Sequence, residues 1–170
     1  PIITQQFTFL CLRGVSLFES FNLHPKLLSA INDQKWSEPT DVQAQSLPEA
    51  LAGKDMLISA ETGSGKTGAY LIPCLHSLMS DRKPKSGTRV LVLVPTRELA
   101  QQVNKDCDEL SKYSGVKSTV IRGGQEFQFQ ASLLRRNPEV VIATPGRLTE
   151  HLEKGTADLS DVEFVILDEC

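Results

Sequence analysis

Short hydrophobic runs alternate with longer amphipathic segments from about residue 56 to the end of the chain. The runs are rich in Val, Ile and Leu and do not alternate with polar residues, a pattern typical of strands that are buried on both faces. We therefore predict five strands, at Met56–Ala60, Val90–Val94, Thr119–Ile121, Val140–Ala143 and Phe164–Leu167.

The segments between these runs have helical spacing. After Thr96, hydrophobic positions recur at steps of three or four, which predicts a helix with one buried face. These positions are Leu99, Val103, Cys107 and Leu110. A second helix is expected to start at Thr144-Pro145, a capping residue followed by Pro, and to stop at Gly155. Residues 17–48 read as helical pieces that are broken by the prolines Pro25, Pro39 and Pro48.

This alternation of strands and helices predicts an α/β fold, with a parallel β-sheet covered by helices on both faces. In such a sheet, ligands bind beyond the carboxyl ends of the strands. The segments with chemically suggestive residues all follow predicted strands, and they are Glu61–Thr67, Pro95–Glu98, Gly123-Gly124, Thr144–Arg147 and Asp168-Glu169. The sequence therefore predicts ligand binding at this edge of the sheet.

The composition is that of one globular domain, because the chain has 170 residues, of which 40% are hydrophobic and 23% charged. The net charge of −3 gives no global attraction to nucleic acid, so any such binding needs a local surface. No apolar run is long enough to span a membrane. The four cysteines form no CxxC pair, which argues against a zinc or redox site and favours scattered thiols in a reducing compartment.

Residues 60–67 read AETGSGKT, and they start at the last residue of the first predicted strand. Gly63 and Gly65 let successive backbone N–H groups turn toward an anion, and the start of the following helix adds its positive end. Lys66 supplies a mobile positive charge for phosphates, and Thr67 a hydroxyl for Mg²⁺. The segment predicts a phosphate-binding loop, although the strict pattern has Gly where this chain has Ala60.

The last predicted strand ends in two acids, Asp168 and Glu169. In a phosphate-loop protein the first acid holds Mg²⁺, and the second positions and deprotonates the attacking water. Many strands end in acidic turns, so this pattern is informative only together with Lys66 on the same sheet.

Four further motifs resemble those of the DEAD-box RNA helicases. Residues 95–100 read PTRELA, residues 123–124 read GG, and residues 144–147 read TPGR. Residues 39–43, PTDVQ, resemble the adenine-reading Q motif, with Phe18 in the place of its upstream aromatic residue. The resemblance covers about residues 18–169. It implies a RecA-like P-loop NTPase domain that uses ATP and Mg²⁺ and binds RNA.

The resemblance also implies roles for individual residues. Lys66, Asp168 and Glu169 would be catalytic, and Thr67 and Asp168 would hold Mg²⁺. The implied nucleotide-binding residues, of which Gln43 would hydrogen-bond adenine, are Phe18, Trp36, Gln43, Glu61, Thr62, Gly63, Ser64, Gly65, Lys66 and Thr67. The residues implied to contact the RNA sugar-phosphate backbone are Pro95, Thr96, Arg97, Gly123, Gly124, Thr144, Gly146 and Arg147.

Three of these residues have a second interpretation. Trp36, which replaces the usual Phe, either stacks on the base or is a core aromatic. Arg97 and Arg147 either contact RNA or are solvated or internally paired charges. Lys35 and Asp41 stand where the family usually has Gly and Pro, which bears on the selectivity for adenine.

We expect residues 1–16 to be an N-terminal extension, non-native or disordered, and residues 17–170 to be a first RecA-like domain that is incomplete at its C-terminus. Cys170 stands where the family usually has Ala, either as a DECD-type variant or as a boundary artefact. We expect the full-length protein to be a monomeric, cytoplasmic or nuclear ATP-dependent RNA helicase. Without the second RecA-like domain and its arginine fingers, the 170-residue chain should bind nucleotide weakly and not unwind RNA. The alternatives are a DNA-directed motor of the same superfamily and a truncated, non-catalytic product that binds RNA or a partner.

Overall fold

The computed structural model describes residues 17–81 and 87–169, so the expectations for residues 1–16 and for Cys170 lie outside the described residues. Four parallel strands form one sheet in the order β2-β3-β1-β4. The strands are β1 Val90–Leu93, β2 Ser118–Ile121, β3 Val140–Ala143 and β4 Phe164–Leu167. The helices are the 3-10 helix η1 Leu17–Phe21, then α1 Pro25–Asp33, α2 Asp41–Leu51, α3 Lys66–Ser80, α4 Arg97–Ser111, α5 Phe127–Leu134 and α6 Pro145–Glu153.

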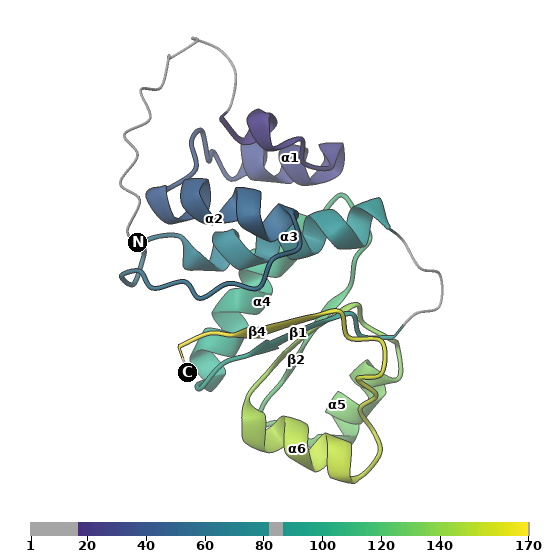
Figure 1. Cartoon of the computed structure of the whole chain (residues 1–170). Helices are drawn as coiled ribbons and strands as arrows, with labels where there is room; N and C mark the ends of the chain where they lie inside the picture. Colours follow the sequence, from purple (N-terminus) through teal and green to yellow (C-terminus); the bar gives the residue numbers. More distant parts are fainter. Residues whose placement is uncertain (1–16, 82–86, 170) are drawn as a thin grey trace.

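The sheet separates two hydrophobic cores. Because successive residues of a strand point to opposite faces, Val90 and Val92 of β1 join a large core with side chains of α1 to α4. Leu91 between them joins a smaller core with Leu134 of α5 and Leu148 of α6. Figure 1 shows the same arrangement, with α1 to α4 on one side of the sheet and α5 and α6 on the other. The predicted α/β fold, a parallel sheet with helices on both faces, is confirmed.

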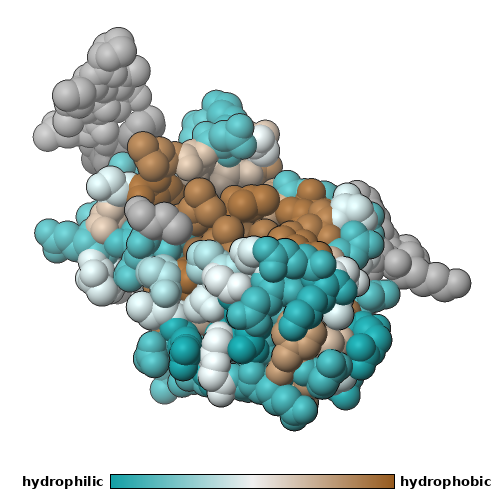
Figure 2. Space-filling model, turned by 90° about the horizontal axis from the view of Figure 1, so that it is seen from below, coloured by the Kyte–Doolittle hydropathy of each residue, from teal (hydrophilic) through white to brown (hydrophobic). Residues whose placement is uncertain are grey.

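Four of the five predicted strands are present, with bounds that shift by no more than one residue. The central strands β1 and β3 are almost fully buried, as their non-alternating hydrophobic sequences predict. The edge strand β4 is covered on one face only, and its side chains Val165 and Leu167 are 60% and 64% exposed. Figure 2 shows a hydrophobic band across the middle of the face seen from below, beside a hydrophilic region.

The predicted strand at Met56–Ala60 is wrong. This segment has no regular secondary structure, and Leu57 is 99% exposed. A groove of about 390 Å³ is lined by side chains of α2 and by residues 54–59. A strand exists only when its backbone pairs with a neighbour, and β4 pairs with β1 alone among the described strands. The hydrophobic run therefore remains an extended connection to α3.

The predicted starts of α4 and α6 and the predicted end of α6 agree with the structure. Thr96 is the N-cap of α4, and its hydroxyl accepts a hydrogen bond from Leu99 N at 3.2 Å. Thr144 is the N-cap residue of α6, but its side chain makes no capping bond. Gly155 ends that helix with a φ of +62°, a conformation that suits glycine. Pro48, which was expected to break a helix, lies inside α2, because that helix continues with one backbone donor fewer.

Candidate functional site

The loop before α3 has the backbone geometry of an anion site. Gly63 and Gly65 have φ values of +81° and +92°, which residues with a Cβ atom rarely adopt. Gly65 is the N-cap of α3, and no side chain in the described part of the chain caps this end. The first N–H groups of α3 therefore lack a side-chain acceptor, and the helix dipole makes this end positive. Both properties favour a phosphate.

Gln43 of α2 joins this loop to the helix in front of it. Its side chain is 3% exposed, and Nε2 donates to Gly65 O at 3.0 Å. Its Oε1 accepts from Thr40 N at 3.1 Å, and Thr40 Oγ1 accepts from Gln43 N at 3.4 Å, a reciprocal capping box. A glutamine amide has two N–H donors and two acceptor lone pairs. One N–H and one lone pair are used in these two contacts, and the other N–H and lone pair have no partner among residues 17–81 and 87–169.

Close packing around Gln43 explains two glycines of the motif. A Cβ atom added at Gly65 would lie 2.8 Å from both Gln43 Nε2 and Thr40 Oγ1. One added at Gly68, in the first turn of α3, would lie 2.6 Å from Gln43 Nε2 and 3.2 Å from the Trp36 ring. The segment with the predicted adenine-reading residues thus packs directly on the start of α3.

Lys66 turns back onto its own loop. Its Nζ donates to the carbonyl oxygens of Ala60 and, at 3.0 Å, of Glu61. A phosphate would offer this ammonium stronger acceptors than two neutral carbonyls, because hydrogen bonds between charged groups are the stronger ones. Lys66 is therefore close to the loop that would bind the phosphates, and its hydrogen-bond partners among residues 17–81 and 87–169 are two neutral carbonyls.

Asp168, at the carboxyl end of β4, is connected to α3 by Tyr70. The Tyr70 hydroxyl donates to Asp168 Oδ2 at 2.8 Å. Burial, followed by the negative charge of Asp168, raises the pKa of Tyr70 well above its usual range, so the phenol remains a donor. Tyr70 lies one turn after Lys66 on α3, and the sequence analysis gave it no role. An aromatic residue at this spacing was the only available signal.

The remaining predicted nucleotide residues differ in accessibility. Phe18 is fully buried in the core, with its ring centroid 6.5 Å from that of the half-buried Trp36. Glu61, Thr62 and Glu169 are exposed. Trp36 therefore packs against the start of α3. Phe18 packs beside it in the core and has no exposed surface.

The donor set at this end of α3 suits a nucleotide with Mg²⁺. Thr67 supplies a hydroxyl and Asp168 a carboxylate, and Mg²⁺ prefers such hard oxygen ligands, completed by phosphate oxygens and water. The uncapped helix start and Lys66 suit the phosphates. The residues present thus fit ATP or ADP with Mg²⁺.

The predicted RNA-contacting segments follow three neighbouring strands. Because the sheet order is β2-β3-β1-β4, the loops after β2, β3 and β1 are adjacent, and Asp168 follows the fourth strand. The predicted residues are Gly123-Gly124 in the loop after β2, Thr144–Arg147 at the start of α6, and Pro95–Arg97 at the start of α4. The predicted nucleotide-binding residues and the predicted RNA-contacting residues therefore occupy different parts of one sheet edge.

Arg97 lies against the backbone of Gly123 and Gly124. A Cβ atom added at Gly124 would lie 2.6 Å from Arg97 Nη1, and one added at Gly123 would lie 3.1 Å from Nη2. Gly124 also has a φ of +81°. Arg97 is exposed and has no acidic partner among residues 17–81 and 87–169. Its positive charge is therefore available at this surface, which argues against the internal salt bridge and agrees with either a ligand contact or a solvated charge.

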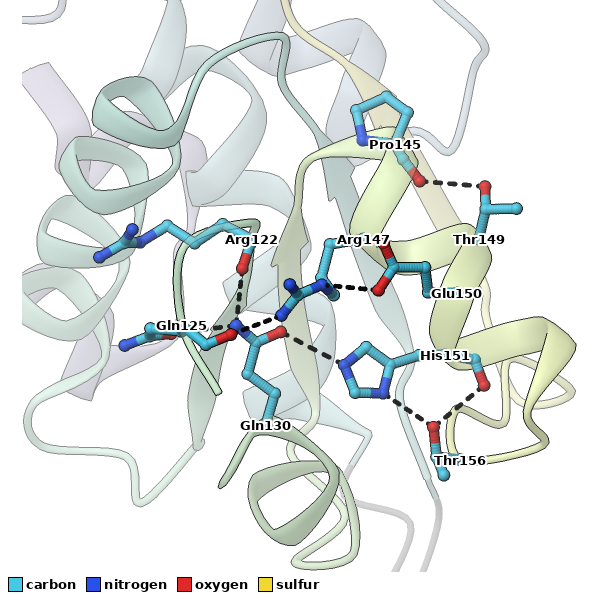
Figure 3. Close-up of polar contacts among 9 residues, drawn as sticks. All are labelled: Arg122, Gln125, Gln130, Pro145, Arg147, Thr149, Glu150, His151 and Thr156. Atoms are coloured by element: carbon cyan, nitrogen blue, oxygen red, sulfur yellow. Dashed lines mark hydrogen bonds and ion pairs between the residues drawn. The ribbon is translucent and has the colours of Figure 1, made fainter. Parts of the chain in front are cut away.

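Arg147 has the opposite environment. Its side chain is 15% exposed, Nη1 donates to Gln125 O at 2.8 Å, and Nε forms an ion pair with Glu150 Oε2 at 3.1 Å. Figure 3 shows the guanidinium between the loop after β2 and helix α6. The structure thus supports an internal pairing of Arg147, while Gly146 has open space around it.

Two buried polar residues next to Arg147 were missed by the sequence analysis. Gln130 and His151 are both fully buried and hydrogen-bonded to each other. His151 has no ligand or nucleophile spacing in the sequence, and Gln130 belongs to no recognised motif. Only their tertiary contacts distinguish them.

Comparisons with known proteins agree with these motifs. Residues 40–170 match the family model described as DEAD/DEAH box helicase. The chain is 46% identical over 158 residues to the ATP-dependent rRNA helicase RRP3 of Candida glabrata, covering 90% of this chain and 31% of that protein. It is 40% identical to the ATP-dependent RNA helicase SrmB of Haemophilus influenzae, covering 92% of this chain and 36% of that protein. The chain thus spans about a third of the length of these curated relatives.

A solved structure shares the fold. The crystal structure of a hypothetical ATP-dependent RNA helicase from Sulfolobus tokodaii matches with a TM-score of 0.76 and 37% sequence identity. The match covers 85% of this chain and 41% of that one. In the described part of the chain, no helix has the length and apolarity that a membrane span requires.

Proposed function

The chain belongs to the DEAD/DEAH box helicase family, and we propose that it forms the ATP-binding domain of an ATP-dependent RNA helicase. In this proposal, residues 17–170 are the first of two RecA-like domains. The second domain completes the catalytic site and the RNA-binding groove. The curated relatives described above are named as RNA helicases, which supports RNA as the nucleic acid.

The nucleotide binds at the start of α3. Gly63, Gly65 and Lys66 contact the phosphates, and Thr67 and Asp168 hold Mg²⁺. Bound Mg²⁺ neutralises the developing charge on the phosphates. Glu169 orients the attacking water and takes up its proton. Gln43 uses its remaining N–H and its remaining lone pair on the adenine edge, and Trp36 packs beside it.

RNA binds along the loops after β1, β2 and β3. Arg97 provides a positive charge, and backbone N–H groups of Gly123, Gly124 and Gly146 contact phosphate oxygens. Thr96 and Thr144 add hydroxyls at helix starts, where the dipoles favour an anion. Contacts of this kind recognise the backbone and not the base sequence.

One observation carries the proposal. Residues that are distant in the sequence converge on the first turns of α3, since Gln43 donates to Gly65 O and Tyr70 donates to Asp168. The predicted adenine-reading residue is thereby bonded directly to the phosphate loop, and the predicted Mg²⁺ ligand is bonded to the helix that this loop starts.

Nucleotide binding is tested by titrating the 170-residue chain into Mg²⁺ and a fluorescent ADP analogue. Replacing Lys66 by Ala should reduce the affinity at least tenfold, because one charge-assisted contact to phosphate is lost. Lys26→Ala is the matched control, since Lys26 is exposed on α1, away from the loop. A folded Lys66→Ala variant with unchanged affinity would contradict the proposed site.

Catalysis is tested with both the chain and the intact protein. We expect the isolated chain to bind nucleotide weakly and to hydrolyse ATP at little above background, because arginine fingers contribute on the order of 10³–10⁵ in rate. RNA-stimulated hydrolysis by the 170-residue chain would refute this. In the intact protein, RNA should stimulate the ATPase more than DNA of the same length, and the reverse order would favour a DNA-directed motor.

A further inference from the structure

Gln130 of α5 and His151 of α6 form a buried polar contact outside the proposed nucleotide site. Both residues are fully buried, and His151 Nε2 lies 3.2 Å from Gln130 Oε1. A buried amide or imidazole is unfavourable unless its polar atoms are hydrogen-bonded. In Figure 3 these side chains connect the loop after β2 with α6, and each of their polar atoms faces a partner.

Gln130 holds the glycine loop at both of its ends. Its Nε2 donates to Arg122 O at 2.7 Å and to Gln125 Oε1 at 3.2 Å. Arg122 precedes Gly123, and Gln125 follows Gly124, so one amide group fixes the residues on either side of the two glycines. The glycines themselves have no side chains with which to hold their conformation.

The orientation of the Gln130 amide determines which ring nitrogen of His151 carries a proton. Both amide N–H groups of Gln130 are used, so its oxygen must accept from His151, and Nε2 of the imidazole therefore carries a proton. The other ring nitrogen, Nδ1, lies 2.8 Å from Thr156 Oγ1. Burial, and after it the positive charge of Arg147, lowers the pKa of His151, which favours the neutral ring. The ring also stacks on Phe127, with centroids 4.1 Å apart.

A second connection runs from α6 to the same loop. Arg147, one turn before His151 on α6, donates to Gln125 O at 2.8 Å. Gln125 is thus held by α5 through Gln130 and by α6 through Arg147. The contacts form a closed ring from α6 through Gln125 and Gln130 back to α6, and a closed ring permits less relative movement than a single contact.

We propose that Gln130 and His151 are positioning residues, which fix the spacing between the loop Gly123–Gln125 and the segment Thr144–Arg147. This inference rests on the proposed function, because those two segments belong to the proposed RNA surface. Neither side chain contacts RNA. Their effect is to pre-organise backbone N–H groups that bind the sugar-phosphate backbone of a single strand, and such groups bind well only when they are held within a fraction of an ångström.

The test uses the 170-residue chain and a fluorescein-labelled single-stranded RNA of uridines, with binding measured by anisotropy at low salt. Gln130→Glu keeps the shape of the side chain but cannot donate to Arg122 O. We expect it to weaken RNA binding about tenfold, through a displaced glycine loop. Gln128→Glu is the matched control, because Gln128 is exposed on the same helix and the charge change is the same. It should change the affinity no more than about twofold.

Conservative and disruptive changes at His151 separate positioning from simple loss of structure. His151→Gln retains a donor toward Gln130 and should restore most of the affinity that His151→Leu loses. In all variants the affinity for the fluorescent ADP analogue should stay within about twofold of the parent chain, since the nucleotide site lies on another part of the sheet edge. If Gln130→Glu fails to fold, Thr156→Val removes only the hydroxyl that faces His151 Nδ1 and serves as the milder variant.

Amide resonances of Gly123 and Gly124 in ¹⁵N NMR spectra distinguish failure of this inference from failure of the proposed function. The positioning variants should shift both resonances without RNA, and RNA should shift them in the parent chain. Unchanged Gly123 and Gly124 amides on RNA addition to the parent chain would overturn the RNA surface, and the inference with it. RNA binding by a folded Gln130→Glu chain as tight as that of Gln128→Glu would overturn the positioning role alone.

Discussion

Replacing Gln43 by Glu changes one NH₂ group of the proposed nucleotide site into an oxygen and leaves the shape of the side chain unchanged. The carboxylate can still accept from Thr40 N, the contact of 3.1 Å that closes the capping box. It cannot donate to Gly65 O, which lies 3.0 Å from Gln43 Nε2. The substitution therefore puts two acceptor oxygens against each other at a position that is 3% exposed.

The expected loss of stability follows from these contacts. A neutral hydrogen bond contributes about 1 kcal/mol, and a buried acceptor left without its donor adds about 1–3 kcal/mol. The free energy of unfolding should therefore fall by roughly 2–4 kcal/mol. A domain of this size has about 5–15 kcal/mol of stability, so the variant should remain folded under native conditions. Its affinity for the ADP analogue should fall at least tenfold, because the N–H that we propose to face adenine is lost with the other one.

Urea unfolding followed by circular dichroism measures the change. With a slope of about 2 kcal/mol per molar urea, the midpoint should move down by about 1–2 M. Gln45→Glu is the matched control, since Gln45 is exposed on the same helix, and its midpoint should change little. Burial raises the pKa of the introduced carboxyl, and the protonated form donates again. The loss of stability in Gln43→Glu should therefore become smaller as the pH falls from about 7 to about 5.

Equal urea midpoints for Gln43→Glu and Gln45→Glu would refute this reasoning, because the contact to Gly65 would then contribute nothing. Normal stability with a strong loss of nucleotide affinity would mean that Gln43 serves the ligand and not the loop. Lost stability with normal nucleotide affinity would mean the reverse.

Three further predictions concern stability. Arg89→Met should lower the free energy of unfolding by roughly 3 kcal/mol in urea titrations, because the 2% exposed guanidinium forms contacts of 3.1 and 2.8 Å with Glu163. Tyr70→Phe should lower it by about 1.5 kcal/mol at neutral pH, since the half-buried Asp168 loses a hydroxyl donor. Burial, and after it the charge of His24, lowers the pKa of His76, so the unfolded chain binds more protons than the folded one. The free energy of unfolding should therefore fall as the pH is lowered from about 7.5 to about 5.5. His76→Gln should make this pH dependence weaker.

Each of these changes has a matched control. Lys105→Met removes an exposed cation that lies 4.0 Å from Glu109, and it should cost less than about 0.5 kcal/mol. An equally small loss in Arg89→Met would show that the buried Arg89 guanidinium and its ion pair with Glu163 contribute little. Tyr113→Phe removes an exposed hydroxyl that donates to Asp33 at 2.5 Å, and a loss equal to that of Tyr70→Phe would contradict the role of burial. A pH dependence unchanged by His76→Gln would assign it to other groups.

Much of the fold follows from local sequence patterns. The strands β1 and β3 were predictable because strands with helices on both faces need uninterrupted hydrophobic residues. The start of α4 was predictable because Thr96 caps it with its own hydroxyl. The phosphate loop was predictable because Gly63 and Gly65 adopt positive φ values that its geometry requires.

Pairing between distant segments was not predictable in this way. Met56–Ala60 has the composition of a strand, yet whether it becomes one depends on a neighbouring backbone, and that neighbour is no property of the run itself. The same limit applies to Arg147, whose sequence context allowed either an RNA contact or an internal pairing. Its 2.8 Å bond to Gln125 O, which supports the internal pairing, is visible only in the tertiary structure.

The sequence by itself determined the fold class, the family and the chemistry available at the sheet edge, because these depend on residue type, spacing and hydrophobic period. The tertiary structure alone decided which polar groups are already paired. Gln43 is bonded to Gly65, Asp168 to Tyr70, and Gln130 to His151, whereas Arg97 lies unpaired on its glycines among the described residues. The physical reason is that hydrogen bonds act over about 3 Å, and only folding brings residues from distant parts of the chain that close.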